Sequence, residues 1–299
     1  MSVINDIKRM ERDRVVTPPS WLLSNVHYLA IVGSESYGAA TDLSDRDVQG
    51  FCIPPKDDIF PHLRGEIPGF GNQIQRFENW QQHHCRDPAK SYEYDFCIYS
   101  IVKFFQLCME NNPNMLDVIS VPTRCIVHTT NIGQMVRDNR HLFYHAGCFH
   151  KFRGYAFKQM SKLDAGANRS NPKRAADIAR LGYDAKFLMH AVRLALECEQ
   201  LLTTGQLELD RDVQTYQSIR RGDWTLEHGK RWWESKERDL ETLYANSKVL
   251  PRKPDEEAIK QLLLNCLETH FGSISTAVQR NPSLDNVLND LHAVLNKYR

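Results

Sequence analysis

The sequence lacks the features that mark several classes of protein. No two cysteines lie closer than 11 positions apart, so it contains no CxxC pair of the kind found in zinc ribbons and thioredoxin-like redox sites. No apolar run approaches the ~20 residues that a transmembrane helix needs. The first 14 residues alternate charges and contain no apolar segment like that of a signal peptide. These absences predict a cytoplasmic protein without a membrane partner, in which the cysteines are reduced and mostly buried.

The sequence also lacks an excess of either charge. Lys and Arg number 38 against 37 Asp and Glu, which gives a net charge of +1. This balance excludes a grossly basic nucleic-acid coat and an acidic tail, but it allows a local basic groove. With 299 residues, of which 41% are hydrophobic and 25% charged, the composition is that of an ordinary globular protein of about two domains.

The first part of the chain mixes strand and helix patterns. Apolar runs bounded by Gly and Pro predict strands, and apolar residues at helical spacing predict helices. Residues 57–89 are expected to be irregular, apart from a short strand near Gln73–Phe77. The expected strands are Val26–Val32, Arg46–Ile53 and Tyr92–Ile98, and the expected helices are Val3–Arg14, a helix from Ile101 to the stop at Asn111-Asn112-Pro113, and Met115–Ser120.

After about residue 130 only helical patterns remain. They cover Phe149–Leu163, Pro172–Leu202, Leu226–Asn246, Pro254–Val278 and Leu284–Tyr298. The sequence therefore predicts an α+β fold. A domain with a small mixed sheet and helices is expected over residues 1–128, and an all-helical domain over residues 129–299.

Acidic residues follow the first predicted strand in an informative order. Gly33-Ser34 directly ends that strand, and such a turn offers backbone N–H groups and a small hydroxyl to a phosphate. Asp45 and Asp47 then stand two apart at the start of the next strand, which places both side chains on one face. Two carboxylates so close need a cation, and Mg²⁺ prefers such oxygen ligands together with substrate phosphates. Asp95, in the third strand, is the candidate for a third acid that would complete a two-metal site.

Each of these motifs also has an ordinary interpretation. An isolated Asp-x-Asp is most often a solvated turn, and no Gly-Lys-Ser/Thr follows Gly33 as it would in a Walker loop. The joint order of strand, Gly-Ser, Tyr37-Gly38, Asp-x-Asp and strand favours the functional interpretation. The His83-His84-Cys85 run is not expected to bind a metal, because adjacent side chains point different ways and no distant partner has suitable spacing.

The helical part supplies cations. Lys186, His190 and Arg193 fall at i, i+4 and i+7, along one side of an otherwise apolar helix, where a triphosphate would be a suitable partner. The alternative is a solvated face with local pairing to Glu197 or Asp184. Upstream, basic residues that include Lys158 alternate with aromatic ones, which is typical either of a nucleic-acid surface or of a packed amphipathic helix.

These motifs resemble the DNA polymerase beta-like nucleotidyltransferase superfamily and, more narrowly, its RlaP branch, which is associated with RNA repair. The resemblance runs from about residue 26 to 210. Where that branch more often has Glu, this sequence has Asp117, which is interpreted as structural. The matching motifs are Gly33-Ser34-x-x-Tyr37-Gly38, Ser44-Asp45-x-Asp47-x-x-Gly50, Asp95 before the Phe104-Phe105 helix, Asn112-Pro113-Asn114, Phe152-x-Gly154-Tyr155-Ala156 and Lys186-x-x-x-His190-x-x-Arg193-Leu194.

The resemblance implies a polymerase-beta-like catalytic domain over residues 1–128 and a metal-dependent transfer of a nucleoside monophosphate from an NTP to a hydroxyl. Mg²⁺, or alternatively Mn²⁺, would be the cofactor, the NTP the co-substrate, and an RNA or tRNA end the acceptor. Asp45 and Asp47 would hold both metals, and Asp95 would hold one of them and favour deprotonation of the acceptor. The nucleotide would be bound by Gly33, Ser34, Tyr37, Lys158, Lys186, His190 and Arg193.

Two other functions fit the same residues. The acceptor would be a protein or a small molecule in the first, and the protein would be a nucleotide-binding sensor without turnover in the second. The three clustered acids argue against the sensor, because binding alone does not need them. No feature of the sequence indicates which NTP is used or which oligomeric state the protein adopts.

Overall fold

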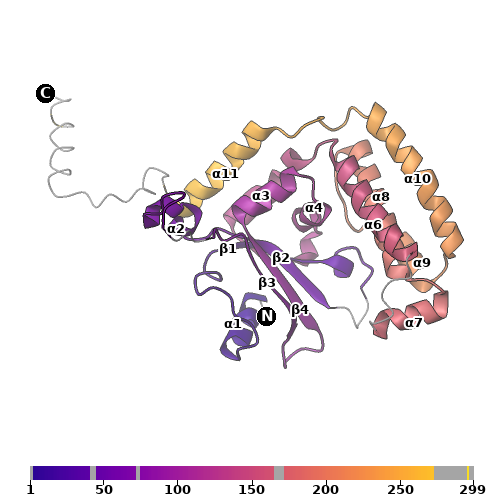
Figure 1. Cartoon of the computed structure of the whole chain (residues 1–299), viewed down its shortest axis with the longest axis horizontal. Helices are drawn as coiled ribbons and strands as arrows, with labels where there is room; N and C mark the ends of the chain where they lie inside the picture. The colour runs from indigo at the N-terminus through magenta and orange to yellow at the C-terminus, as the bar shows by residue number, and fades with distance from the viewer. Residues whose placement is uncertain (1–2, 41–44, 72–74, 165–171, 273–294, 296–299) are drawn as a thin grey trace.

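The computed structural model describes residues 3–40, 45–71, 75–164, 172–272 and 295. Its centre is a five-stranded sheet with the order β3-β4-β2-β1-β5 (Figure 1). β2 and β4 run parallel, and the other neighbouring strands are antiparallel, so the sheet is mixed as predicted. The strands are β1 (Val26–Val32), β2 (Arg46–Cys52), β3 (Asn79–Arg86), β4 (Glu93–Ser100) and β5 (Ile126–Thr129).

The two faces of the sheet are covered by different helices. Alternate residues of β2 point to opposite faces, so that Val48 belongs to one apolar cluster and Phe51 to the other. The helix α1 (Val3–Arg12) packs on the Val48 side, and α3 (Ile101–Met109) and α4 (Pro113–Ser120) pack on the Phe51 side. Asp47 and Gln49 share the face of Phe51, which is therefore the face toward most of the helices.

Most helices after β5 lie together beside one end of the sheet (Figure 1), namely α6 (Cys148–Asp164), α7 (Pro172–Leu181), α8 (Ala185–Thr204), α9 (Val213–Arg221) and α10 (Leu226–Asn246). Among them α8 is the most central, with apolar residues buried on nearly every side, an Asp184 N-cap and Gly205 in the left-handed conformation at its end. By contrast, α11 (Glu256–Phe271) returns to pack near α3 and α5 (Asn131–Asp138). The short α2 (Lys56–Ile59) completes the α-helices of the described residues.

One apolar cluster joins the sheet to these helices. It contains Tyr28 and Phe104 from the first part of the chain and Leu188 and Leu201 from α8. The division into domains at residues 128 and 129 stays a prediction. The α+β class itself is confirmed by the mixed sheet followed by helices.

Most predicted elements are confirmed, and the differences have local causes. The expected strand near Gln73–Phe77 is wrong for its described residues 75–77, which carry no regular structure, and β3 lies within the stretch expected to be irregular. β3 is an edge strand, so its exposed polar residues show no apolar pattern. The single helix expected over Pro172–Leu202 is also wrong, because Gly182 adopts a φ of +79° and separates α7 from α8.

Three further differences concern ends and short elements. The elements α2, β5, α5 and α9 were not expected from the sequence. The helix expected over Pro254–Val278 is observed as α11, which ends at Phe271. The helix expected over Leu284–Tyr298 lies outside the described residues, apart from residue 295.

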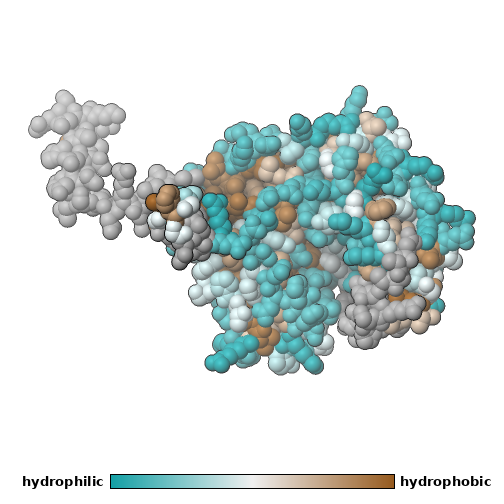
Figure 2. Space-filling model, viewed as in Figure 1, coloured by the Kyte–Doolittle hydropathy of each residue, from teal (hydrophilic) through white to brown (hydrophobic). Residues whose placement is uncertain are grey.

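The cysteines and the surface agree with the composition. All eight cysteines are free and buried, as predicted. On the face drawn in Figure 2, hydrophilic residues predominate and hydrophobic ones gather in small separate areas. Within the described part of the chain, no helix is both long and apolar enough to cross a bilayer.

A histidine pair connects α11 to the sheet and predicts acid sensitivity. His27 Nε2 lies 2.9 Å from His270 Nδ1, and burial, together with His270 and His128, lowers the pKa of His27 to about 4. In the unfolded chain His27 takes up a proton near pH 6.5, whereas in the folded protein it does so only near pH 4. The free energy of unfolding should therefore fall as the pH drops from 7 toward 4, and His27 should contribute about 2 kcal/mol of that loss. Thermal unfolding measured across this range should show a smaller loss for His27→Gln than for the natural protein. The exposed His141→Gln is the control, and an equal loss in all three proteins would contradict the prediction.

Candidate active site

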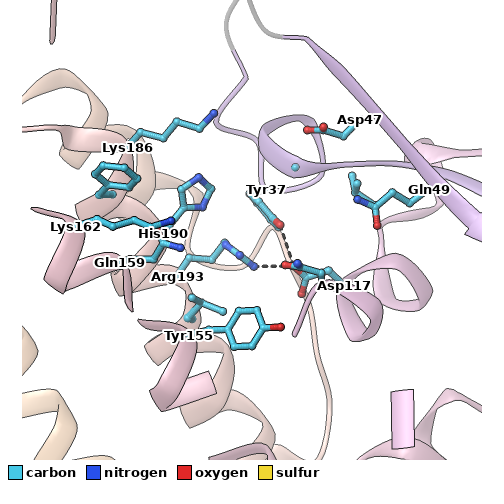
Figure 3. A pocket seen from close by; sticks show the side chains of 15 residues that line it. Tyr37, Asp47, Gln49, Asp117, Tyr155, Gln159, Lys162, Lys186, His190 and Arg193 are labelled. Carbon is cyan, nitrogen blue, oxygen red and sulfur yellow. Dashed lines mark hydrogen bonds and ion pairs between the residues drawn. The ribbon is translucent and has the colours of Figure 1, made fainter. Parts of the chain in front are cut away.

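A pocket of about 400 Å³ opens between the sheet and the helices α6 and α8. One side is formed by β1, β2 and α4 and carries Asp47, Gln49 and Asp117. The other side carries Lys186 and His190 (Figure 3). The pocket therefore has carboxylates facing basic side chains, and its size is in the range of small-molecule sites. The remaining lining residues are Val32, Gly33, Tyr37, Asn114, Tyr155, Gln159, Lys162, Phe187, Arg193 and Leu194.

The strand register brings two of the predicted acids together. Asp47 on β2 pairs directly with Asp95 on β4 in the parallel ladder, so both side chains lie on the same face. Burial, together with the charges of Asp95 and Asp45, raises the pKa of Asp47 to about 6 against the opposing effects of Lys186 and His83. Burial and the neighbouring negative charges therefore make the ionised form of Asp47 unfavourable, and a bound cation would relieve this.

Asp95 is held in place from β3. The ladder between β3 and β4 is irregular between Gln82 and Cys85, and His84 adopts a positive φ of 55° at this bulge. The His84 backbone N–H donates to Asp95 Oδ1 at 2.7 Å, and His83 Nδ1 lies 3.6 Å from Asp95 Oδ2. The bulge thus fixes the orientation of the Asp95 carboxylate, next to Asp47 on the neighbouring strand.

The turn after β1 lies against Asp47. The predicted turn is observed as a short 3₁₀ helix, η1 (Gly33–Glu35), which begins directly after the strand. Gly33 has a φ of +71°, and a Cβ on it would come within 2.6 Å of Asp47 Oδ2. A glycine is required here both for the backbone conformation and for the space that the carboxylate occupies. Ser34 is half-buried in the same turn but does not line the pocket.

This geometry predicts opposite effects at two glycines. Gly33→Ala should lower the free energy of unfolding by about 1–3 kcal/mol, because it combines left-handed strain with the contact to Asp47. Gly154→Ala, in the middle of α6, should raise stability by about 0.5–1 kcal/mol, because a Cβ there meets nothing within 4 Å. Denaturant unfolding of both variants tests the pair. A Gly33→Ala protein as stable as the Gly154→Ala protein would show that the turn is not constrained as described.

The predicted cation line is partly directed at the pocket. Lys186 and His190 both line it, and Lys186 is near enough to lower the pKa of Asp47. Arg193 also lines it, but the residue is only 4% exposed and its guanidinium is bound by two carboxyl groups of the protein. Its Nη1 lies 2.7 Å from Asp117 Oδ2 and 2.8 Å from Glu197 Oε1. The local pairing with Glu197 that the sequence left open is therefore confirmed.

The buried ion cluster also includes an aromatic residue. Tyr37 donates its hydroxyl to Asp117 Oδ2 at 2.8 Å, and the Arg193 guanidinium lies 4.3 Å above its ring (Figure 3). Burial raises the pKa of both Glu197 and Asp117 against the charge of Arg193, because the two carboxyl groups share one buried guanidinium. Asp117 is thus the buried partner of both Tyr37 and Arg193.

Three of the other predicted residues lie outside the pocket lining. Asp45 is exposed at the start of the second described segment, and Asp95 is half-buried beside the pocket. Lys158 is exposed on α6, with its ammonium 5.6 Å from the Tyr155 ring. Within the described residues, no three His, Cys, Asp or Glu side chains are grouped closely enough to hold a metal ion by themselves.

Sequence reasoning did not select several lining residues. Gln49 was detectable, because a polar side chain two positions after Asp47 in an apolar strand shares its face. Asn114 and Tyr155 stand in motifs that carry the family resemblance, but no role was assigned to them. Gln159 had no signal, because the helices that form the pocket come together only in the tertiary structure.

Two known proteins resemble this chain. An uncharacterized 38.9 kDa protein of the nrdC-mobD intergenic region of Enterobacteria phage T4 is 28% identical over 139 residues, which cover 46% of this chain and only 38% of that protein. The crystal structure of a nucleotidyltransferase-like protein from Exiguobacterium sibiricum matches 89% of this chain and 80% of its own, at 13% identity and a TM-score of 0.29. The family model described as RlaP, RNA repair pathway DNA polymerase beta family, matches residues 2–265, so the resemblance in the motifs is confirmed and the chain belongs to this family.

Proposed function

We propose that the protein is a metal-dependent nucleotidyltransferase that moves a nucleoside monophosphate from an NTP to a hydroxyl of an RNA or tRNA end. The observation that carries the proposal is the pairing of Asp47 with Asp95 beside a pocket whose opposite wall carries Lys186. Membership of the polymerase beta family supports nucleotidyl transfer as the general reaction. The metal, the NTP and the RNA acceptor are the specific parts of the proposal.

The carboxylates suit a hard divalent cation. Asp47 and Asp95 are in register on adjacent strands, and their mutual repulsion contributes to the raised pKa of Asp47. Two carboxylates with open neighbouring positions match the preference of Mg²⁺ for a few protein oxygens completed by substrate phosphates and water. Asp47 and Asp95 would hold the ion, with Asp45 as the third acid. When bound, the ion would neutralise charge on the phosphates during transfer.

The chain's own groups would orient the reactants. Lys186 and His190 face the carboxylates and would bind the triphosphate, and Gly33 lets the phosphates approach the backbone closely. The acceptor hydroxyl would lose its proton to Asp95 as its oxygen forms a bond to the α-phosphorus. The bond from the α-phosphorus to the bridging oxygen breaks, and pyrophosphate leaves with that electron pair. Positioning and charge neutralisation supply most of the rate in this chemistry.

An RNA acceptor is favoured by part of α6. Lys151 pairs with Glu110, Arg153 pairs with Glu237, and the aromatic residues Phe149 and Phe152 are buried, so this half of the basic and aromatic pattern serves packing. The next turns differ. There Phe157 is 59% exposed and directly precedes the exposed Lys158, and the exposed Lys162 one turn further on lines the pocket. Basic residues with an exposed aromatic ring are typical of surfaces that bind single-stranded nucleic acid.

A transfer assay tests this function. The full chain is incubated with Mg²⁺, each α-labelled NTP, and tRNA, RNA oligonucleotides, protein extract or small-molecule hydroxyl acceptors. We expect label in RNA and release of pyrophosphate, with both lost on chelation of the metal. Phe157→Ala should weaken RNA use more than NTP binding, and the exposed Val249→Ala is its matched control. Label only in protein or in a small molecule would overturn the RNA acceptor, and NTP binding without any transfer would indicate a sensor.

A further inference from the structure

Unpartnered polar atoms are concentrated in the pocket. Among the described residues, four buried side-chain atoms have no hydrogen-bond partner. Three of them, Gln49 Oε1, Asp117 Oδ1 and Arg193 Nε, belong to residues that line the pocket, and only Asn111 does not. Buried polar atoms nearly always have a partner, so an exception calls for an explanation such as a water or a ligand. Three exceptions around one pocket point to a ligand that supplies the missing partners.

The position of these atoms assigns them to the nucleoside rather than to the phosphates. Gln49 lies two residues beyond Asp47 on the same face of β2, which is about 7 Å along the strand. Asp117, on α4, is only 1% exposed and lies on the Gln49 side of the pocket (Figure 3). The two unpartnered atoms on this side, a carboxylate oxygen and an amide oxygen, are both hydrogen-bond acceptors. They bind hydrogen-bond donors, and the oxygens of a phosphate are acceptors themselves. With the triphosphate between Asp47 and Lys186, the nucleoside would extend toward Gln49.

The combination of groups matches one edge of certain bases. Two acceptor oxygens suit the two N–H groups of an exocyclic amine, and the Arg193 Nε–H suits an unprotonated ring nitrogen beside it. Adenine and cytosine present this amine-plus-nitrogen pattern, whereas uracil and hypoxanthine carry a carbonyl and an N–H instead. We propose that Gln49 and Asp117 accept hydrogen bonds from the exocyclic amino group of an adenine or cytosine nucleotide in this pocket. The inference rests on the proposed function, because it takes the bound molecule to be an NTP.

Matched nucleotide pairs test the inference. Affinities of the full chain are measured by calorimetry, with Mg²⁺ present, for ATP against ITP and for CTP against UTP, which differ in the amino group. We expect the amino-bearing member of at least one pair to bind about tenfold or more tightly, because its analogue leaves buried acceptors unpaired. Gln49→Leu should bring that ratio close to one, and Gln49→Glu, which keeps an acceptor oxygen, should retain most of it. Gln159→Leu alters another amide of the pocket wall and should leave the ratio unchanged even if overall affinity shifts.

The outcomes separate this inference from the function on which it rests. If NTPs bind but both pairs bind equally, or if Gln49→Leu leaves the ratio intact, the amino group is not read by these atoms. A loss of affinity for 2′,3′-dideoxynucleotides without any amino effect would assign the acceptors to the sugar hydroxyls and overturn the inference. If no NTP binds at all, the proposed function fails and the inference with it. Thermal unfolding checks that the variants fold. If Gln49→Leu does not fold, the nucleotide pairs measured on the natural protein decide whether the amino group is recognised.

Discussion

Replacing Arg193 by methionine is expected to destabilise the protein by about 3–5 kcal/mol. Arg193 is 4% exposed, and its guanidinium is the cation that Asp117 and Glu197 contact directly. Methionine has a similar length but no charge, so Asp117 would be left as a buried carboxylate whose hydroxyl partner, Tyr37, supplies only one hydrogen bond. Denaturant unfolding at neutral pH measures the loss.

Two further variants separate charge from packing. The triple variant Arg193→Met, Asp117→Asn, Glu197→Gln removes the uncompensated charges and should recover part of the lost stability, because buried ion pairs can often be replaced by uncharged groups at little net cost. Arg231→Met, on α10, changes an exposed arginine that lies 3.7 Å from Glu227, and it should cost less than about 0.5 kcal/mol. If Arg193→Met were no more destabilising than Arg231→Met, the buried cluster would not contribute as its geometry indicates.

Arg193 also illustrates what helical spacing can and cannot predict. The i, i+4, i+7 spacing correctly places Lys186, His190 and Arg193 along one side of α8, and all three line the pocket. Spacing says nothing of partners from other elements. Asp117 is 76 residues away in the sequence, so only the packing of α4 against α8 reveals that the last of the three cations is already neutralised.

The strands show the same division between local and tertiary information. The pairing of Asp47 with Asp95 depends on the parallel register of β2 and β4, and the sequence supplied the two acids but not that register. The bulge at His84 that holds Asp95 was beyond prediction, because β3 is an exposed edge strand with no apolar period. Patterns of period two or 3.6 identify buried elements, and they fail where a strand lies at the edge or where a single irregular residue sets the geometry.

Replacing Asp47 by asparagine is expected to lower nucleotidyl transfer by about 10²–10³-fold or more, which is the range for losing one group that stabilises transition-state charge. The same substitution should raise the stability of the protein. Burial and the neighbouring acids raise the pKa of Asp47 to about 6, so keeping it ionised at neutral pH costs free energy that asparagine does not. We expect a gain of about 1 kcal/mol after allowance for partial exposure, seen as a rise in Tm of about 2–4 °C. Asp138→Asn, on the exposed face of α5, is the matched control and should change neither quantity.

Magnesium provides the deciding measurement. A cation that binds the folded protein raises Tm by mass action, and at this site it would also relieve the repulsion between Asp47 and Asp95. The natural protein and Asp138→Asn should therefore gain stability as Mg²⁺ is added, whereas Asp47→Asn should gain much less. Full transfer by Asp47→Asn, or an equal response of all three proteins to Mg²⁺, would remove Asp47 from the catalytic assignment. A variant that is more stable, inactive and no longer responsive to the ion would instead show that this carboxylate is maintained for function at the expense of stability. Replacing a purely structural acid would lower stability and activity together.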